Sequence, residues 1–325
     1  MAELNMVQAL NTALHELFAT DPRVLLMGED VGKNGGVFRV SEGLFDQFGG
    51  TRVIDTPLAE SGIIGTAIGL AVGGMRPIAE IQFMGFLYPG LDQLFSHAGR
   101  LRTRSLERVT VPLVVRMPYG GGIRAPEQHA DSAEAYLTHT PGLKVVVPST
   151  PYDAKGLLYA AVEDPDPVIF LEPIRMYRLG RMAVPEGRFT VPIGQARIAR
   201  EGQDLTLIAW GAMTHLALTV AEDFAARGIS IEVLDMRTLA PLDREAIGRS
   251  VAKTGRCVIL HEAPRTGGLA GEITALIMET AFWSLKAPVS RVTGFDVPYP
   301  AYAWEDFYMP NAERLTKAIE DTVKD

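Results

Sequence analysis

Residues Asp55 to Phe83 read DTPLAESGIIGTAIGLAVGGMRPIAEIQF, and this stretch decides the fold. One carboxylate, Glu60, stands at the head of a helix-forming run that carries no further charge before Arg76. The segment that follows, Pro77 to Phe83, is short and mostly apolar, which is typical of a buried strand. A nearly charge-free helix joined to such a strand predicts a helix packed within a core of sheet and helices.

Three glycines in this helix, Gly65, Gly69 and Gly73, recur every four residues and so share one helix face. Each costs about 1 kcal/mol relative to alanine, and close approach of another backbone is the expected reason for them. Two interpretations of Glu60 follow. It is either an ordinary acidic residue of a first helical turn, favoured by the helix dipole, or a catalytic acid held where the glycine face meets another subunit.

Strands and helices alternate on both sides of this stretch, which predicts α/β architecture with two doubly wound, mainly parallel sheets. Residues 1–178 form the expected first domain and 193–325 the second, joined by a linker over 179–192. The first domain is expected to contain a helix within Met1–Thr20, strands over Arg23–Met27 and Thr51–Ile54, a helix over Tyr88–Arg102, strands over Pro112–Arg116 and Leu143–Val147, a helix over Tyr152–Glu163, and a strand over Val168–Leu171. The second is expected to contain strands over Leu205–Trp210, Ser230–Leu234, Cys257–His261 and Val289–Thr293 and helices over Met213–Arg227, Arg244–Thr254, Leu269–Ser284 and Asn311–Thr322.

Composition excludes several classes of protein. A net charge of -8 over 325 residues, with scattered basic residues, argues against a nucleic-acid partner. The longest apolar run, Ile63 to Met75, is shorter than the roughly 20 residues of a membrane span. The amphipathic start lacks the apolar core of a signal peptide, so a cytoplasmic protein is expected. Cys257 is the single cysteine, which excludes an intrachain disulfide and predicts a buried thiol.

Two segments carry candidate functional side chains. Glu29 and Asp30 directly follow a buried strand, and parallel sheets place functional loops at that edge. The long polar loop from Tyr119 to Ser132 places His129 where an imidazole could reach a bound reactant. No histidine has metal-ligand spacing with another, and a Gly-x-Ser-x-Gly nucleophile motif is missing, so a hydrolase is not favoured.

Several sequence blocks in a fixed order resemble one family across essentially the whole chain. They are Gly28–Val31 (GEDV), Asp55–Glu60 (DTPLAE), Ala79–Phe83 (AEIQF), His129, Pro141–Val146 (PGLKVV) and Asp153–Leu157 (DAKGL). Together they resemble the β subunit of the decarboxylating 2-oxo acid dehydrogenase. The resemblance implies a thiamine diphosphate enzyme built as an α2β2 heterotetramer. In it the α subunit holds the diphosphate and Mg²⁺, while the β subunit supplies the pyrimidine half of the site and is inactive alone.

The resemblance also implies roles for single residues. Glu60 is similar to the glutamate that hydrogen-bonds the cofactor's aminopyrimidine and favours its imino tautomer, which deprotonates the thiazolium carbon. Glu29 resembles a second acid nearby on a proton path. His129 matches a histidine that assists acyl transfer to the lipoyl arm of the acyltransferase. The positions expected to line the pyrimidine are Leu58, Gln82 and Phe86.

Further expectations concern ions, partners and substrate. Resemblance implies a potassium site at Leu113, Ala161, Val162, Asp164 and Asp166. The second domain resembles the transketolase C-terminal domain, which docks the subunit-binding domain of the lipoyl acyltransferase core, and acidic Glu320, Asp321 and Asp325 would suit a basic module.

The loop from Arg124 to Ser132 resembles pyruvate-type relatives, so pyruvate is the favoured substrate. Branched-chain 2-oxo acids and acetoin stay open as alternatives, as does, more distantly, a non-catalytic nucleotide- or flavin-binding module. Co-expression with an α subunit would separate these alternatives.

Overall fold

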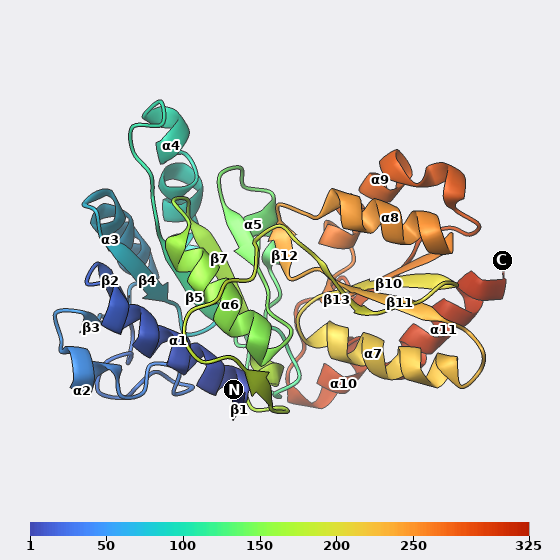
Figure 1. Ribbon diagram of the computed structural model, residues 1–325, viewed down its shortest axis with the longest axis horizontal. Helices are drawn as coiled ribbons and strands as arrows, with labels where there is room; N and C mark the ends of the chain where they lie inside the picture. The colour runs from blue at the N-terminus through green and yellow to red at the C-terminus, as the bar shows by residue number, and fades with distance from the viewer. Residues whose placement is uncertain (325) are drawn as a thin grey trace.

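The computed structural model describes residues 1–324 as two α/β units that lie side by side (Figure 1). Within these residues the first sheet has seven strands in the order β12-β6-β7-β5-β4-β2-β3, and all neighbours are parallel except β12 and β6. Its strands are β2 (Val24–Gly28), β3 (Val53–Asp55), β4 (Arg76–Glu80), β5 (Val114–Tyr119), β6 (Lys144–Val146), β7 (Val168–Pro173) and β12 (Thr238–Ala240).

The second sheet has the order β14-β13-β10-β11-β9, in which only β9 is antiparallel to its neighbour within the described residues. Its strands are β9 (Arg197–Arg200), β10 (Leu205–Ala209), β11 (Ile231–Asp235), β13 (Cys257–Pro264) and β14 (Ser290–Gly294). Cys257 is buried in β13, as predicted. The predicted α/β class with two doubly wound sheets is confirmed.

Helices cover both faces of the sheets (Figure 1). They are α1 (Met6–Thr20), α2 (Leu44–Phe48), α3 (Glu60–Val72), α4 (Leu101–Arg104), α5 (Glu134–Thr138), α6 (Pro151–Glu163), α7 (Ala212–Ala225), α8 (Arg244–Thr254), α9 (Leu269–Thr280), α10 (Glu305–Tyr308) and α11 (Ala312–Lys324). Helix α1 starts with a reciprocal capping box, in which Asn5 Oδ1 accepts from Gln8 N (2.9 Å) and Gln8 Oε1 accepts from Asn5 N (3.1 Å). No helix of residues 1–324 combines the length and apolar character that a membrane span requires.

Two expected elements differ in the structure. The helix expected over Tyr88–Arg102 is broken into a 3-10 turn η1 (Met84–Gly90), a π-helical turn η2 (Gln93–Ala98) and α4. Pro89 interrupts the backbone ladder, and a Cβ on Gly90 would lie 2.6 Å from Ile64 Cδ1, so the chain bends there to pack on α3. The expected linker contains a strand, β8 (Met182–Val184), which pairs with an unforeseen N-terminal strand, β1 (Ala2–Leu4).

The apolar core is continuous across both sheets. Alternate residues of the strands point to opposite faces, so one cluster joins Leu26 of the first sheet with Leu207 of the second, and the other joins Met27 with Ile208. Strand β12 strengthens this union because it follows the second domain's β11 in sequence yet pairs with β6 of the first sheet. The two units therefore pack as one body.

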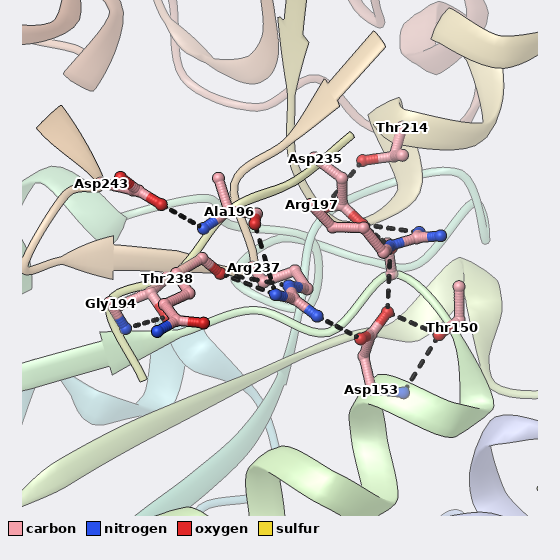
Figure 2. Close-up of polar contacts among 12 residues, drawn as sticks. Thr150, Asp153, Gly194, Ala196, Arg197, Thr214, Asp235, Arg237, Thr238 and Asp243 are labelled. Carbon is pink, nitrogen blue, oxygen red and sulfur yellow. Dashed lines mark hydrogen bonds and ion pairs between the residues drawn. The ribbon is translucent and has the colours of Figure 1, made fainter. Parts of the chain in front are cut away.

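Ion pairs reinforce the junction on one side, as Figure 2 shows. Asp153, in the first turn of α6, accepts a hydrogen bond from Arg237 Nη1 (3.1 Å) and faces Arg197 Nε at 3.8 Å. Arg197 also pairs with Asp235 at 2.9 Å. Since Asp153 and Asp235 are both buried, these arginines supply the countercharge that burial requires.

Candidate active site

The predicted carboxylates meet at the carboxyl edge of the first sheet. Gly28 at the end of β2 lies in register between Asp55 of β3 and Glu80 of β4, so the loops after these strands start side by side. Glu29 follows β2 and is only 9% exposed, and Glu60 opens α3 shortly after β3. Burial raises the pKa of the Glu29 carboxyl, and the nearby charges of Glu60 and Asp30 raise it further. The structure thus places Glu29 and Glu60 after neighbouring strands at the same edge of the sheet.

Backbone contacts fix the loop after β2 at this edge. Asp55 Oδ1 accepts a hydrogen bond from Gly32 N (2.7 Å), and Thr56 N donates to Gly28 O (2.9 Å). Gln82 Nε2 donates to Asp30 Oδ2 (3.2 Å), which places the predicted pyrimidine neighbour Gln82 beside the acidic turn. These hydrogen bonds hold the carboxylates of Asp30 and Asp55 and the amide of Gln82 in one fixed arrangement at the edge.

The connection from β3 to α3 is partly open to solvent in the single chain, with Leu58 exposed and Glu60 half-buried. The Leu58 side chain is 80% exposed. Of the three predicted glycines, Gly65 faces the Gln93 side chain and Gly73 lies just after the helix end, where it caps α3. Among residues 1–324, no heavy atom lies within 4 Å of where a Cβ on Gly69 would stand. The crossing of another subunit over this face stays a prediction.

Three rings pack beside the edge. The His129 ring lies 4.4 Å from Phe83 and 5.0 Å from Phe86 between centroids. His129 Nδ1 is 2.9 Å from the Glu127 carbonyl oxygen, which only accepts, so Nδ1 carries a proton. In the neutral ring Nε2 is then the acceptor, which is the form that a general base requires.

A buried ionic network that the sequence analysis did not identify lies beneath these rings. The Arg116 guanidinium forms two 2.7 Å hydrogen bonds with Glu172 and a further ion pair with Glu80. Tyr177 donates to Glu172 and its ring lies 5.2 Å from Phe38, which in turn contacts Phe83. The sequence feature that indicates this network is Arg116, a lone charged residue inside an otherwise apolar strand, because a buried charge requires a partner.

The residues of the predicted potassium site have cationic partners within the protein. Lys144 Nζ lies 2.7 Å from Asp164 and 3.5 Å from Asp166, and Arg102 pairs with Asp166 at 2.8 Å. Arg76 donates to the carbonyl of Val162. A potassium ion would fit among these oxygen atoms only if Lys144 and Arg76 moved aside. The predicted potassium site, which also includes Leu113 and Ala161, stays a prediction. Among residues 1–324, no cluster of three or more His, Cys, Asp or Glu side chains is arranged to hold a metal.

Comparison with known proteins identifies the family. Residues 2–179 match the family "Transketolase, pyrimidine binding domain" and residues 194–315 match "Transketolase, C-terminal domain". The pyruvate dehydrogenase E1 component subunit beta of Bacillus subtilis is 49% identical over 311 residues, which cover 96% of each chain. That of Acholeplasma laidlawii is 46% identical over 324 residues, covering 100% of this chain and 99% of the relative. The chain belongs to the pyruvate dehydrogenase E1 β-subunit family.

The family resemblance predicted from the sequence blocks is thereby confirmed. Among solved structures, an inactive β4 tetramer of a split gene transketolase matches 99% of both chains with a TM-score of 0.80 at 24% identity. This likeness shows the transketolase-type fold alone. The edge that carries Glu29 and Glu60 accordingly belongs to the unit that matches the pyrimidine-binding domain.

Proposed function

We propose that this chain is the β subunit of a thiamine diphosphate-dependent pyruvate dehydrogenase. In the proposed reaction pyruvate loses carbon dioxide, and its acetyl group passes to one sulfur of the lipoyl disulfide while the other sulfur is reduced to a thiol. The observation that carries the proposal is the placement of Glu29 after β2 and of Glu60 after the neighbouring strand β3, at the carboxyl edge of the unit that matches the pyrimidine-binding domain. The names and full-length identity of the relatives support pyruvate as the substrate.

The residues at this edge fit the pyrimidine half of the cofactor. Exposed Leu58 and half-buried Phe86 offer apolar surface to an aromatic ring, and Glu60 offers a carboxylate to a ring N–H. Within the described part of the chain, the buried Thr56 Oγ1 has no hydrogen-bond partner. When bound, thiamine diphosphate supplies an electron sink for the carbanion that decarboxylation produces. Glu60 holds and exchanges the proton at the pyrimidine ring nitrogen, with Glu29 as its acidic neighbour.

An α subunit is required to complete the site in this proposal. The surface around the start of α3 and along this helix offers exposed Leu58, the half-buried carboxylate of Glu60 and, at Gly69, room for a close backbone crossing. We propose that the α subunit covers it in an α2β2 heterotetramer and holds the diphosphate with Mg²⁺. Docking of a lipoyl acyltransferase core by the second domain and a cytoplasmic location also stay predictions. Three acidic residues were expected to bind the acyltransferase. Of these, Glu320 pairs with Arg227 and Asp321 pairs with Lys317, while Asp325 lies outside the described residues.

Co-expression with an α subunit tests the proposal directly. We expect a heterotetramer by gel filtration and thiamine diphosphate-dependent reduction of an artificial electron acceptor, with pyruvate turned over faster than 2-oxoisovalerate or acetoin. Faster turnover of either rival would instead assign the chain to the branched-chain or acetoin enzymes. A stable monomer that binds no α subunit and turns over none of the three substrates would contradict the proposal and favour a non-catalytic module.

His129 is expected to act in acyl transfer. Substitution His129→Ala removes the Nε2 acceptor beside Phe83 and Phe86, so transfer to a lipoyl domain should fall by about 10²-fold, within the range of general acid–base catalysis. Decarboxylation measured with an artificial acceptor should stay near the wild-type rate. His97→Ala, at an exposed histidine of η2, is the matched control. Equal losses in both assays for His129→Ala would assign this residue another role.

A further inference from the structure

The loop from Tyr119 to Ser132, here the His129 loop, is bound by carboxylates of the second domain. Gly121 N donates to Glu262 Oε2 (2.7 Å) at the end of β13. Arg124 N donates to both carboxylate oxygens of Glu305 in α10 (3.1 and 3.0 Å). The second domain therefore binds two backbone N–H groups in the loop that carries His129.

The triple glycine of the loop makes this approach sterically feasible. Gly120 has φ +85°, and a Cβ on it would lie 2.8 Å from both Glu262 oxygens. A Cβ on Gly121 would collide with the Tyr299 hydroxyl, and one on Gly122 would lie 2.7 Å from Arg175 Cδ. Since larger residues would push the loop away from these side chains, the glycines and the carboxylates form one arrangement.

Both carboxylates are buried, although burying an apolar side chain at either position would cost less free energy. Glu262 is 4% and Glu305 2% exposed, and the Tyr299 hydroxyl is a second donor to Glu305 (2.8 Å). Burial raises the pKa of Glu262 to about 8 although Gly121 N binds it, and the charges of Glu134 and Glu305 add to the rise. Buried acidic groups are normally hydrogen-bonded, and here the donors include the loop N–H groups of Gly121 and Arg124.

The other end of the loop packs on the first domain. A Cβ on Gly85 of η1 would collide with the Gln128 carbonyl, and Tyr88 donates to Asp131 Oδ2 (2.6 Å). A cavity of about 580 Å³ adjoins both the loop, at Gln128 and Asp131, and the second domain, at Glu262. Because this space borders the loop between its two close-packed ends, the hydrogen bonds from the second domain help to determine its path.

We infer that Glu262 and Glu305 are positioning residues that hold the His129 loop against the active site. The inference rests on the proposed function for the role of His129, while the anchoring of the loop stands on geometry alone. It gives the second domain a part in acyl transfer through the backbone of the loop that carries His129.

The substitution Glu262→Ala in the assembled enzyme tests this inference. Trypsin cleavage after exposed Arg124 should accelerate about tenfold, as expected for loss of one buried hydrogen bond, and transfer to a lipoyl domain should slow by a similar factor. Decarboxylation should stay near the wild-type rate. Glu262→Gln should restore both properties, because the amide oxygen accepts from the same N–H. Glu232→Ala, which removes a buried carboxylate that binds Ser250 and Lys253, is the matched control.

Each outcome decides a separate point. Wild-type cleavage and acyl transfer in Glu262→Ala would overturn the inference, as would a Glu262→Gln enzyme that stays as impaired as Glu262→Ala. If His129→Ala leaves acyl transfer unchanged, the role of His129 fails, but cleavage at Arg124 still tests the anchoring. Should Glu262→Ala not assemble, Tyr299→Phe removes only the hydroxyl bound to Glu305. Faster cleavage in that variant supports the inference, and unchanged cleavage overturns it.

Discussion

Glu60→Gln is expected to slow hydrogen–deuterium exchange at the reactive carbon of bound thiamine diphosphate by about 10²- to 10⁴-fold. Glutamine keeps the size of the side chain but cannot take up the proton of a ring nitrogen at neutral pH. Because Glu60 is a half-buried first residue of α3 and glutamine matches its shape, the exchange should change without loss of fold. Nuclear magnetic resonance of the quenched cofactor measures the exchange, and gel filtration checks assembly with the α subunit.

The matched control for this experiment is Glu107→Gln, at an exposed acidic residue outside the carboxyl edge. It should leave the exchange rate at the wild-type value. Normal exchange in Glu60→Gln would mean that Glu60 is only an acidic residue of a first helical turn, stabilised by the helix dipole. That result would remove the central residue from the proposed site while leaving the family assignment intact.

Arg116→Leu is expected to destabilise the chain by about 3–5 kcal/mol, the usual cost of breaking a buried ion pair from one side. Arg116 is 1% exposed and lies between Glu80 and Glu172, so its loss leaves two buried carboxylates without their countercharge. The network supports Tyr177 and, through Phe38, the Phe83 ring against which His129 packs. Urea denaturation followed by circular dichroism measures the change in unfolding free energy.

Two further variants make this experiment decisive. Arg188→Ala breaks the exposed 2.6 Å pair with Glu163 and should cost less than about 1 kcal/mol. Adding Glu80→Gln and Glu172→Gln to Arg116→Leu should recover part of the loss, since neutral amides cost less to bury than carboxylates. An effect of Arg116→Leu as small as that of Arg188→Ala would contradict a structural role for the network.

The sequence predicted where the acidic residues of the site lie, but not the contacts from the second domain that hold the nearby loop. Glu29 and Glu60 could be placed at one edge because parallel strands end at the same side of a sheet. The same rule, applied to β13, would have found Glu262 as well, but nothing in the sequence shows that its partner is Gly121, 141 residues away. Non-local pairings of this kind depend on how the two units pack.

The helix predicted over Tyr88–Arg102 was wrong for the same physical reason. Its residues have helical periodicity, yet Gly90 packs against Ile64 and a Cβ on Gly99 would lie 2.8 Å from the Pro141 carbonyl oxygen. Tertiary contacts thus override local propensity and bend the segment into short turns. The exposure of Leu58 is a different case, because in our proposal it depends on a subunit that this chain's sequence does not describe.

The pairing of β12 with β6 affects the order in which the first sheet is completed during synthesis. The first sheet ends at β6 until residues 238–240 emerge from the ribosome, when β12 pairs with that strand. Until then the growing chain presents unpaired backbone groups, which can template association with other chains. A fragment ended at residue 178 would keep this edge open permanently. Covering of the β6 edge during translation therefore depends on residues that belong, by sequence, to the other half of the molecule.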